Sequence, residues 1–167
     1  LAGLSKAYIL TNNEQAGIHY ADRYIDLSRK SQEQWRERLR EWEQMKKGDV
    51  SPEQRAFYLE KIHGAREKEK GMLMLLGSVH MRRDEFVKAI DRYDEVLALD
   101  PAHVAALVER AQAYAAVNQY EQAVKDLEQY LKLTDARKQR QARINAAELL
   151  DRYRQILTRQ AIGPAPR

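Results

Sequence analysis

Hydrophobic residues in the N-terminal half of the chain recur three or four positions apart, as they do along one face of an α-helix. Neither Gly nor Pro interrupts the chain between Gly17 and Gly48. This pattern predicts one helix of about 30 residues, far longer than a helix of a compact repeat needs. Its apolar face is expected to carry Tyr20, Tyr24, Leu27, Trp35, Leu39, Trp42 and Met45.

A break and a second long helix follow. The break is expected at Gly48, Asp49 and Val50, and the new helix begins with a capping box that has Pro at its first helical position, Ser51-Pro52-Glu53-Gln54. Gly64 and Gly71 are positions at which this helix can bend. Two long helices joined by a tight turn predict an antiparallel hairpin. The Trp35 and Trp42 pair favours packing inside that hairpin, with an exposed docking patch as the alternative.

The C-terminal half contains an internal repeat. Residues 70–103 align without a gap on residues 104–137, a period of 34. The matches fall on small residues where two helices must touch and on large residues that must fill a core. Examples are Leu73 with Leu107, Gly77 with Ala111, Phe86 with Tyr120 and Ala89 with Ala123.

On these residues the sequence resembles the tetratricopeptide repeat family, in which each repeat is a pair of antiparallel helices. The first copy supplies Gly77, His80, Phe86, Ala89, Tyr93 and Pro101, and the second supplies Ala111, Tyr114, Tyr120, Ala123 and Leu127. His80, Tyr130 and Asp135 depart from the family pattern. In physical terms, the alanines let helices approach closely, and Asp100-Pro101 ends a helix because Pro cannot continue it.

The sequence therefore predicts an all-α fold, a helical-repeat array with a long antiparallel hairpin in its N-terminal half. Residues 1–30 form a degraded repeat, with Ser5, Tyr8, Ala16 and Tyr20 at repeat positions, and residues 31–69 form the hairpin extension. Residues 70–103 and 104–137 are the two clear repeats. Residues 138–160 form a capping helix, with the apolar stripe Ala142, Ala146, Leu149, Leu150, Tyr153 and Leu157, and residues 161–167 form a mobile tail.

Composition agrees with this fold and excludes several classes of protein. The 167 residues include 44% hydrophobic residues, only 7 Gly and 4 Pro, and no Cys. Disulfides, thiolate metal sites and cysteine nucleophiles are therefore excluded. The longest uncharged apolar run, residues 71–81, is too short to span a bilayer. Because the chain begins at Leu1, we expect a soluble domain trimmed from a longer or membrane-anchored protein, in a compartment that the sequence does not indicate.

Catalytic motifs are missing from the sequence. It contains no phosphate-binding glycine loop, no H-E-x-x-H and no G-x-S-x-G. Glu60, His63 and Glu67 share a helical face at metal-ligand spacing, but no second Glu-x-x-His pair accompanies them, so we expect a solvated charged face. His80 is expected to replace an aromatic residue at the edge of the core. We expect no enzyme activity, no metal and no cofactor.

The resemblance implies a concave groove lined by the first helix of each repeat. Carried over residue by residue, it places Met74, Leu75, Ser78, Met81 and Arg82 on the first wall, and Val108, Glu109, Gln112, Ala115 and Ala116 on the second, with Arg140 and Arg143 extending the groove from the cap. Such a groove fits a peptide or helix with an apolar anchor and an acidic flank. The alternative is that the N-terminal hairpin covers some of these residues.

A family version of this groove holds a C-terminal carboxylate with a Lys, Asn and Arg clamp. Here Met74 and Ser78 stand where its first Lys and first Asn would be, and Glu109 stands where its second Asn would be. The resemblance therefore disfavours that particular ligand for this chain.

The first functional hypothesis is a non-enzymatic scaffold or adaptor that binds an unidentified protein or peptide, with possible homo-oligomerisation through the long hairpin. The second is binding of an anionic surface or nucleic acid, because residues 136–167 carry 8 Lys or Arg against 2 Asp or Glu. Its candidate residues are Arg137, Lys138, Arg140, Arg143, Arg152, Arg154 and Arg159. Few aromatic residues lie between them, so nucleic acid is the weaker partner hypothesis. A third, a bacterial secretion chaperone, does not match the net charge of +4.

Overall fold

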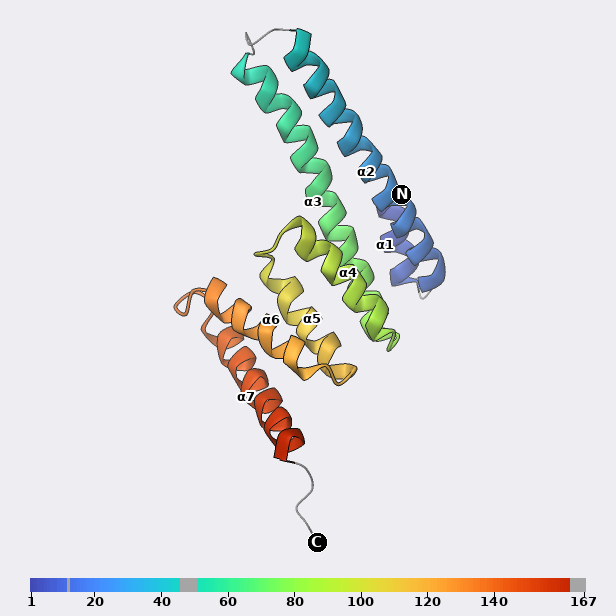
Figure 1. The fold of residues 1–167 in the computed structure, drawn as a ribbon. Helices are drawn as coiled ribbons and strands as arrows, with labels where there is room; N and C mark the ends of the chain where they lie inside the picture. The colour runs from blue at the N-terminus through green and yellow to red at the C-terminus, as the bar shows by residue number, and fades with distance from the viewer. Residues whose placement is uncertain (12, 46–50, 163–167) are drawn as a thin grey trace. The chain divides into compact units, whose positions relative to one another are not determined.

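The structure is a computed structural model that describes residues 1–11, 13–45 and 51–162, which fold into seven α-helices and no strand (Figure 1). The helices are α1 (Ala2–Leu10), α2 (Glu14–Met45), α3 (Pro52–Arg82), α4 (Phe86–Leu99), α5 (Val104–Ala116), α6 (Tyr120–Leu133) and α7 (Arg140–Ile162). The all-α prediction is confirmed. The expected break at residues 48–50 and most of the expected tail, residues 163–167, lie outside the described residues.

The chain divides into two compact units, Leu1–Leu76 and the part from Gly77 onward, and the long helix α3 contributes to both. None of the helices that the structure describes combines the length and apolar character needed to cross a bilayer.

In the first unit, α1 and the start of α2 pack through small residues. Ser5 is fully buried and its hydroxyl donates to the Gly17 carbonyl (2.9 Å). A Cβ at position 17 would lie 2.5 Å from Ile9 Cγ1, so Gly17 lets the two helices touch. Tyr8 and Tyr20 stack with ring centroids 5.3 Å apart. Ser5, Tyr8 and Tyr20 thus lie where α1 and α2 meet, and the assignment of residues 1–30 to a degraded repeat stays a prediction.

The long helix predicted after Gly17 forms as α2, a helix of 32 residues. Its buried residues are Gly17, Ala21, Ile25, Ser28, Gln32 and Leu39, whereas Leu27 and Met45, which the sequence placed on the apolar face, are exposed. Those two placements were wrong. The buried face is built from small and polar side chains because α2 and α3 approach closely, with the Ser28 hydroxyl donating to the Ala65 carbonyl (2.9 Å).

Toward the far end of the hairpin, aromatic rings fill the space between α2 and α3. The Trp35 ring lies 6.1 Å from the rings of Phe57 and Tyr58, and Trp42 lies 6.0 Å from Tyr58. Packing of the tryptophan pair inside the hairpin is therefore confirmed.

Helix α3 begins at Pro52, as predicted, and runs unbroken through Gly64 and Gly71. Its first turn differs from the capping box that the sequence predicts, because the Ser51 hydroxyl donates to Glu53 Oε2 (2.5 Å). This bond lowers the pKa of Glu53.

The second unit repeats the same turn twice. Asp84 and Asn118 have positive φ angles of 56° and 61°, and they are 34 residues apart, the period found in the sequence. Asp and Asn tolerate this left-handed conformation better than other residues with a side chain. The backbone N–H groups of Glu85 and Gln119 close the two turns by donating to the carbonyls of His80 and Tyr114 (2.9 and 2.8 Å). The 34-residue repeat is therefore present in the structure as well as in the sequence.

Small residues at the repeat positions let the helices of this unit pack closely. Gly77 lies under the Tyr93 ring, since a Cβ at position 77 would be 2.7 Å from Tyr93 Cζ. Ala89, Ala111 and Ala123 have no exposed surface. Consecutive helices from α4 to α7 pack against one another.

Helix α7 covers α6 as the predicted cap, and it extends to Ile162, two residues past the predicted end. Ala146, Leu150 and Tyr153 are buried, and the Tyr153 ring lies 5.7 Å from Tyr120. Ala142, which the sequence placed in the apolar stripe, is exposed.

Candidate partner-binding surface

The predicted groove residues lie on α3, α5 and α7. Met74 and Leu75 lie on the part of α3 that belongs to the first unit, and the others belong to the second. Most of these side chains are half-buried, and four are exposed, Arg82, Gln112, Ala116 and Arg140. Within the second unit, both α3 and α5 therefore carry groove candidates, polar and apolar, that are at least partly exposed.

Tyr93 of α4 connects two of these candidates. Burial raises its pKa to about 12, the nearby Ser78 side chain opposes this rise, and the Glu109 carboxylate adds to it. Ser78 of α3 and Glu109 of α5 thus come together around one phenol. The Tyr93 phenol therefore stays neutral at physiological pH. Its ring packs in the core, and polar side chains lie near its hydroxyl.

Arg143 of α7 is half-buried, and hydrogen bonds within the second unit hold its side chain. Its guanidinium donates to the Leu131 carbonyl, to the Thr134 carbonyl (2.6 Å) and to Thr134 Oγ1 (2.8 Å). These acceptors lie at the C-terminal end of α6, where carbonyl groups lack partners within the helix. The sequence proposed Arg143 as a ligand contact, but in the structure it caps α6. Arg140 lies exposed beside it, and both line a shallow pocket with a volume of about 320 Å³.

Sequence analysis missed an ion-pair network centred on Arg110 of α5. Arg110 makes two hydrogen bonds to the Asp126 carboxylate of α6 (2.8 and 2.6 Å) and one to Asp94 of α4 (2.6 Å). Burial acts to lower the pKa of Arg110, but the two carboxylates outweigh it and raise the pKa. The even spacing of Asp94, Arg110 and Asp126, 16 residues apart, was a signal in the sequence that could have indicated the network.

His80 is buried at the edge of the second unit, as the sequence predicts, and it has a polar partner. Its Nδ1 donates to the Glu85 carboxylate (2.7 Å). This hydrogen bond is the main reason that the pKa of Glu85 falls to about 2, with Lys88 and Arg83 adding to it against the opposing effect of burial. The histidine thus fastens the turn between α3 and α4.

Metal chemistry finds no support among the described residues, which include no group of three His, Asp or Glu side chains placed to hold a metal ion. His63 Nε2 lies 3.6 Å from Glu67 Oε1 on an exposed helix face, as the spacing of Glu60, His63 and Glu67 led us to expect.

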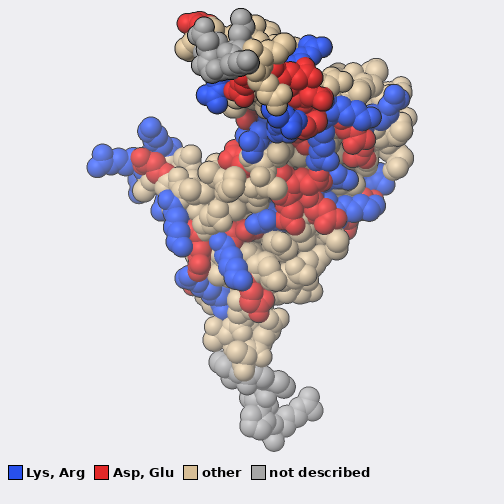
Figure 2. Space-filling view, turned by 45° about the horizontal axis from the view of Figure 1, so that its top comes forward, with Lys and Arg blue, Asp and Glu red and all other residues tan. Residues whose placement is uncertain are grey.

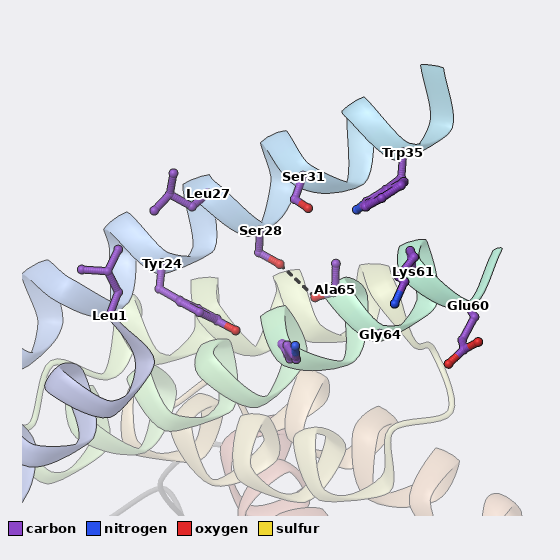
Figure 3. Close-up of a pocket in the computed structure, with 11 residues that line it drawn as sticks. Leu1, Tyr24, Leu27, Ser28, Ser31, Trp35, Glu60, Lys61, Gly64 and Ala65 are labelled. Atoms are coloured by element: carbon purple, nitrogen blue, oxygen red, sulfur yellow. Dashed lines mark hydrogen bonds between the residues drawn. The ribbon is translucent and has the colours of Figure 1, made fainter. Parts of the chain in front are cut away.

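A pocket that the sequence did not indicate lies in the first unit, between α2 and α3 (Figure 3). Its volume is about 640 Å³, within the range typical of ligand pockets. Tyr24 and Trp35 reach from α2 toward α3 at its two ends, with Ser28 and Ser31 between them. No periodic pattern could have revealed it, because the pocket arises where short side chains lie between long ones.

Charge on the visible face is mixed. Figure 2 shows Lys and Arg interspersed with Asp and Glu on this face, with uncharged residues between them. Of the seven basic residues proposed to bind anions, Arg143 caps α6, and Arg154 pairs with Glu128 (2.7 Å). Part of the excess positive charge at the C-terminal end therefore interacts with other residues of this chain.

Comparison with known proteins identifies the second unit. The family model described as tetratricopeptide repeat matches residues 76–151, from the C-terminal part of α3 into α7. A heat-shock protein cognate (HSC) co-chaperone, sgt12 of Aspergillus fumigatus, is 42% identical over 65 residues, which are 39% of this chain and 19% of the relative. The chain thus matches about a fifth of the length of that relative. Residues 76–151 are thus similar to the tetratricopeptide repeat family in sequence, and the repeated turns at Asp84 and Asn118 lie inside this matched segment.

Proposed function

We propose that this chain is a non-enzymatic adaptor that binds a peptide or helix of a protein partner in the groove of its tetratricopeptide repeats. The observation that carries the proposal is the pair of equivalent turns at Asp84 and Asn118, inside the segment that matches the family. Repeats built in this way present the first helix of each pair as one continuous wall. That wall is formed here by the C-terminal part of α3 and by α5.

The side chains on this wall define the kind of ligand. Met81, Val108 and Ala115 are half-buried apolar residues, and they suit an apolar anchor of the ligand. Exposed Gln112 and the nearby carboxylate of Glu109 add polar contacts that fix the position of the ligand along the groove. Arg140 of α7 supplies a positive charge for an acidic flank, whereas Arg143 supports the fold. Met74 and Leu75 remain predictions for the first wall.

The relative's name describes a co-chaperone. The family resemblance includes a version of the groove that takes a ligand ending in a free carboxylate. The residues at the clamp positions, Met74, Ser78 and Glu109, do not favour such a ligand, since Glu109 would repel a carboxylate. We therefore propose an internal segment of the partner as ligand.

The test is capture of partners by the purified chain from nuclease-treated native lysate, with Val108→Glu as the groove variant. A buried charge at position 108 is expected to weaken binding about tenfold, or ~1.4 kcal/mol, without unfolding the chain. Val87→Glu is the matched control, because Val87 is 64% exposed on α4. Bands that resist about 0.5 M salt, persist with Val87→Glu and disappear with Val108→Glu support the groove.

The opposite pattern would move the function to α7. If the captured material vanishes with salt or nuclease and ignores Val108→Glu, the chain binds an anionic surface or nucleic acid. Affinity should then fall with salt with a logarithmic slope of about −0.9 for each phosphate contacted.

A further inference from the structure

We propose that the pocket between α2 and α3 is a second docking site, which takes an amphipathic segment of a protein partner with bulky apolar side chains flanked by carboxylates. The site lies wholly within the first unit, and it shares no lining residue with the repeat groove. It is independent of the function proposed for the groove.

The pocket exists because of the order of side-chain sizes along the two helices. Ser28 and Ser31 of α2 face Gly64 and Ala65 of α3, and their short side chains leave space between the Tyr24 and Trp35 rings (Figure 3). The Ser28 to Ala65 hydrogen bond fixes the backbone separation at this point, so the helices do not close the space by a local shift.

The Trp35 end of the pocket is held by aromatic packing. Trp35 makes an edge contact with Phe57 and a tilted contact with Tyr58, with centroid separations of 6.1 Å in both cases. Leu27, which lines the pocket, and Phe57, which packs against Trp35, remain 50% and 45% exposed. Exposed apolar side chains at a preformed cavity are typical of a protein-docking site.

The charges around the pocket select an acidic partner. Lys61 and Lys68 line the α3 wall two helical turns apart, and within the described residues neither forms an ion pair. The Lys61 ammonium lies 5.1 Å from the Phe57 ring centroid, and the Arg38 guanidinium lies 5.1 Å from that of Trp35. Glu60 is the acidic residue of the lining, and its carboxylate points away from the Trp35 and Tyr24 rings in Figure 3. A ligand carboxylate would therefore meet positive charge beside the Trp35 and Phe57 rings.

The probe for this proposal is a fluorescein-labelled synthetic helix of about four turns, with Leu and Trp on one face and Glu beside them. Its matched form carries Lys in place of every Glu. Binding to the whole chain is followed by fluorescence anisotropy. We expect the acidic form to bind and the basic form to bind at least tenfold more weakly.

Gly64→Leu places an apolar side chain in the pocket, and a Cβ at position 64 meets no atom within 4 Å. Gly71→Leu is the matched control on the same helix, since a Cβ there also meets open space and position 71 lies outside the lining. Both changes favour the helix, so neither is expected to unfold it. The acidic probe should lose at least tenfold in affinity for Gly64→Leu and bind Gly71→Leu like the original chain.

Charge reversal tests the choice of partner. In the double variant Lys61→Glu and Lys68→Glu, the preference between the acidic and basic probes should reverse. A probe that binds the original chain and Gly64→Leu equally, or that loses affinity on Val108→Glu, would overturn the proposal. So would sedimentation showing a dimer of the original chain that Gly64→Leu dissociates, because the pocket would then be occupied by a second copy.

Discussion

At the scale of single residues, the absence of a side chain at position 77 decides how tightly α3 and α4 pack. Tyr93 is fully buried and its ring occupies the place of a Gly77 Cβ. Gly77→Ala should therefore lower the free energy of unfolding by about 1–3 kcal/mol, measured by urea denaturation.

The control for this change is Gly71→Ala, on the same helix but in open space. It should raise stability by up to about 1 kcal/mol, because alanine favours the helix over glycine. If both alanines stabilise the chain alike, the close approach of Tyr93 to position 77 is wrong.

Glu85 gives a second prediction at this scale, which concerns pH. Its pKa in the folded chain is about 2, below the ordinary value of 4.5, mainly because His80 donates to it. The unfolded chain therefore takes up a proton first as the pH falls. The stabilisation by Glu85 should be complete above about pH 4.5 and disappear as the pH falls toward 2.

The measurement compares the original chain with Glu85→Gln in urea at a series of pH values. The stability advantage of the original chain should be present at pH 6 and shrink steadily below pH 4.5. A constant difference across this range would show that the carboxylate charge has no part in fastening the turn.

At the scale of helices, Arg110 joins α4, α5 and α6. Asp126 is only 4% exposed, and Arg110 satisfies both of its carboxylate oxygens. Arg110→Met would leave this buried charge without its partner, and urea denaturation should show a loss of roughly 3 kcal/mol. Adding Asp126→Asn to the same chain should recover at least half of that loss.

The exposed pair between Arg154 and Glu128 is the matched control for Arg110. Arg154→Met should change stability by less than about 1 kcal/mol, since surface ion pairs contribute little. A similar loss for both arginines would mean that burial of Asp126 does not set the cost.

The helices themselves were predictable from the sequence, and the partners of buried polar groups were not. Periodicity located α2, the turn at Asp100-Pro101 ended α4, and the 34-residue period matched the turns at Asp84 and Asn118. Periodicity also placed Leu27 on the buried face and overlooked Gln32, because it counts apolar residues only.

Gln32 lies buried in the hairpin, where it makes a polar contact with α3. Glu69 is 2% exposed and accepts hydrogen bonds from Gln32 Nε2 and Arg29 Nε, each 2.6 Å long. These residues are 37 and 40 positions apart from Glu69, at separations that no local pattern reports. The same limit explains Arg143, because its acceptors at the end of α6 become evident only when α7 packs there.

At the scale of the whole molecule, the chain carries two candidate surfaces in different units. The repeat groove could be inferred from the family resemblance, whereas the pocket between α2 and α3 required the structure. Charges of both signs cover the visible face (Figure 2), which favours selective contacts over general attraction to anions.

If the two surfaces work separately, their variants should act separately. Val108→Glu should weaken the groove ligand about tenfold and leave the acidic helix probe unchanged, and Gly64→Leu should do the reverse. In the double variant each ligand should lose as much affinity as in its own single variant, within about 0.5 kcal/mol, since the sites share no lining residue. Anisotropy titrations of all four chains with both ligands measure this. A coupling above about 1 kcal/mol would mean that one ligand contacts both surfaces, and the chain would then be a single clamp instead of an adaptor with two independent sites.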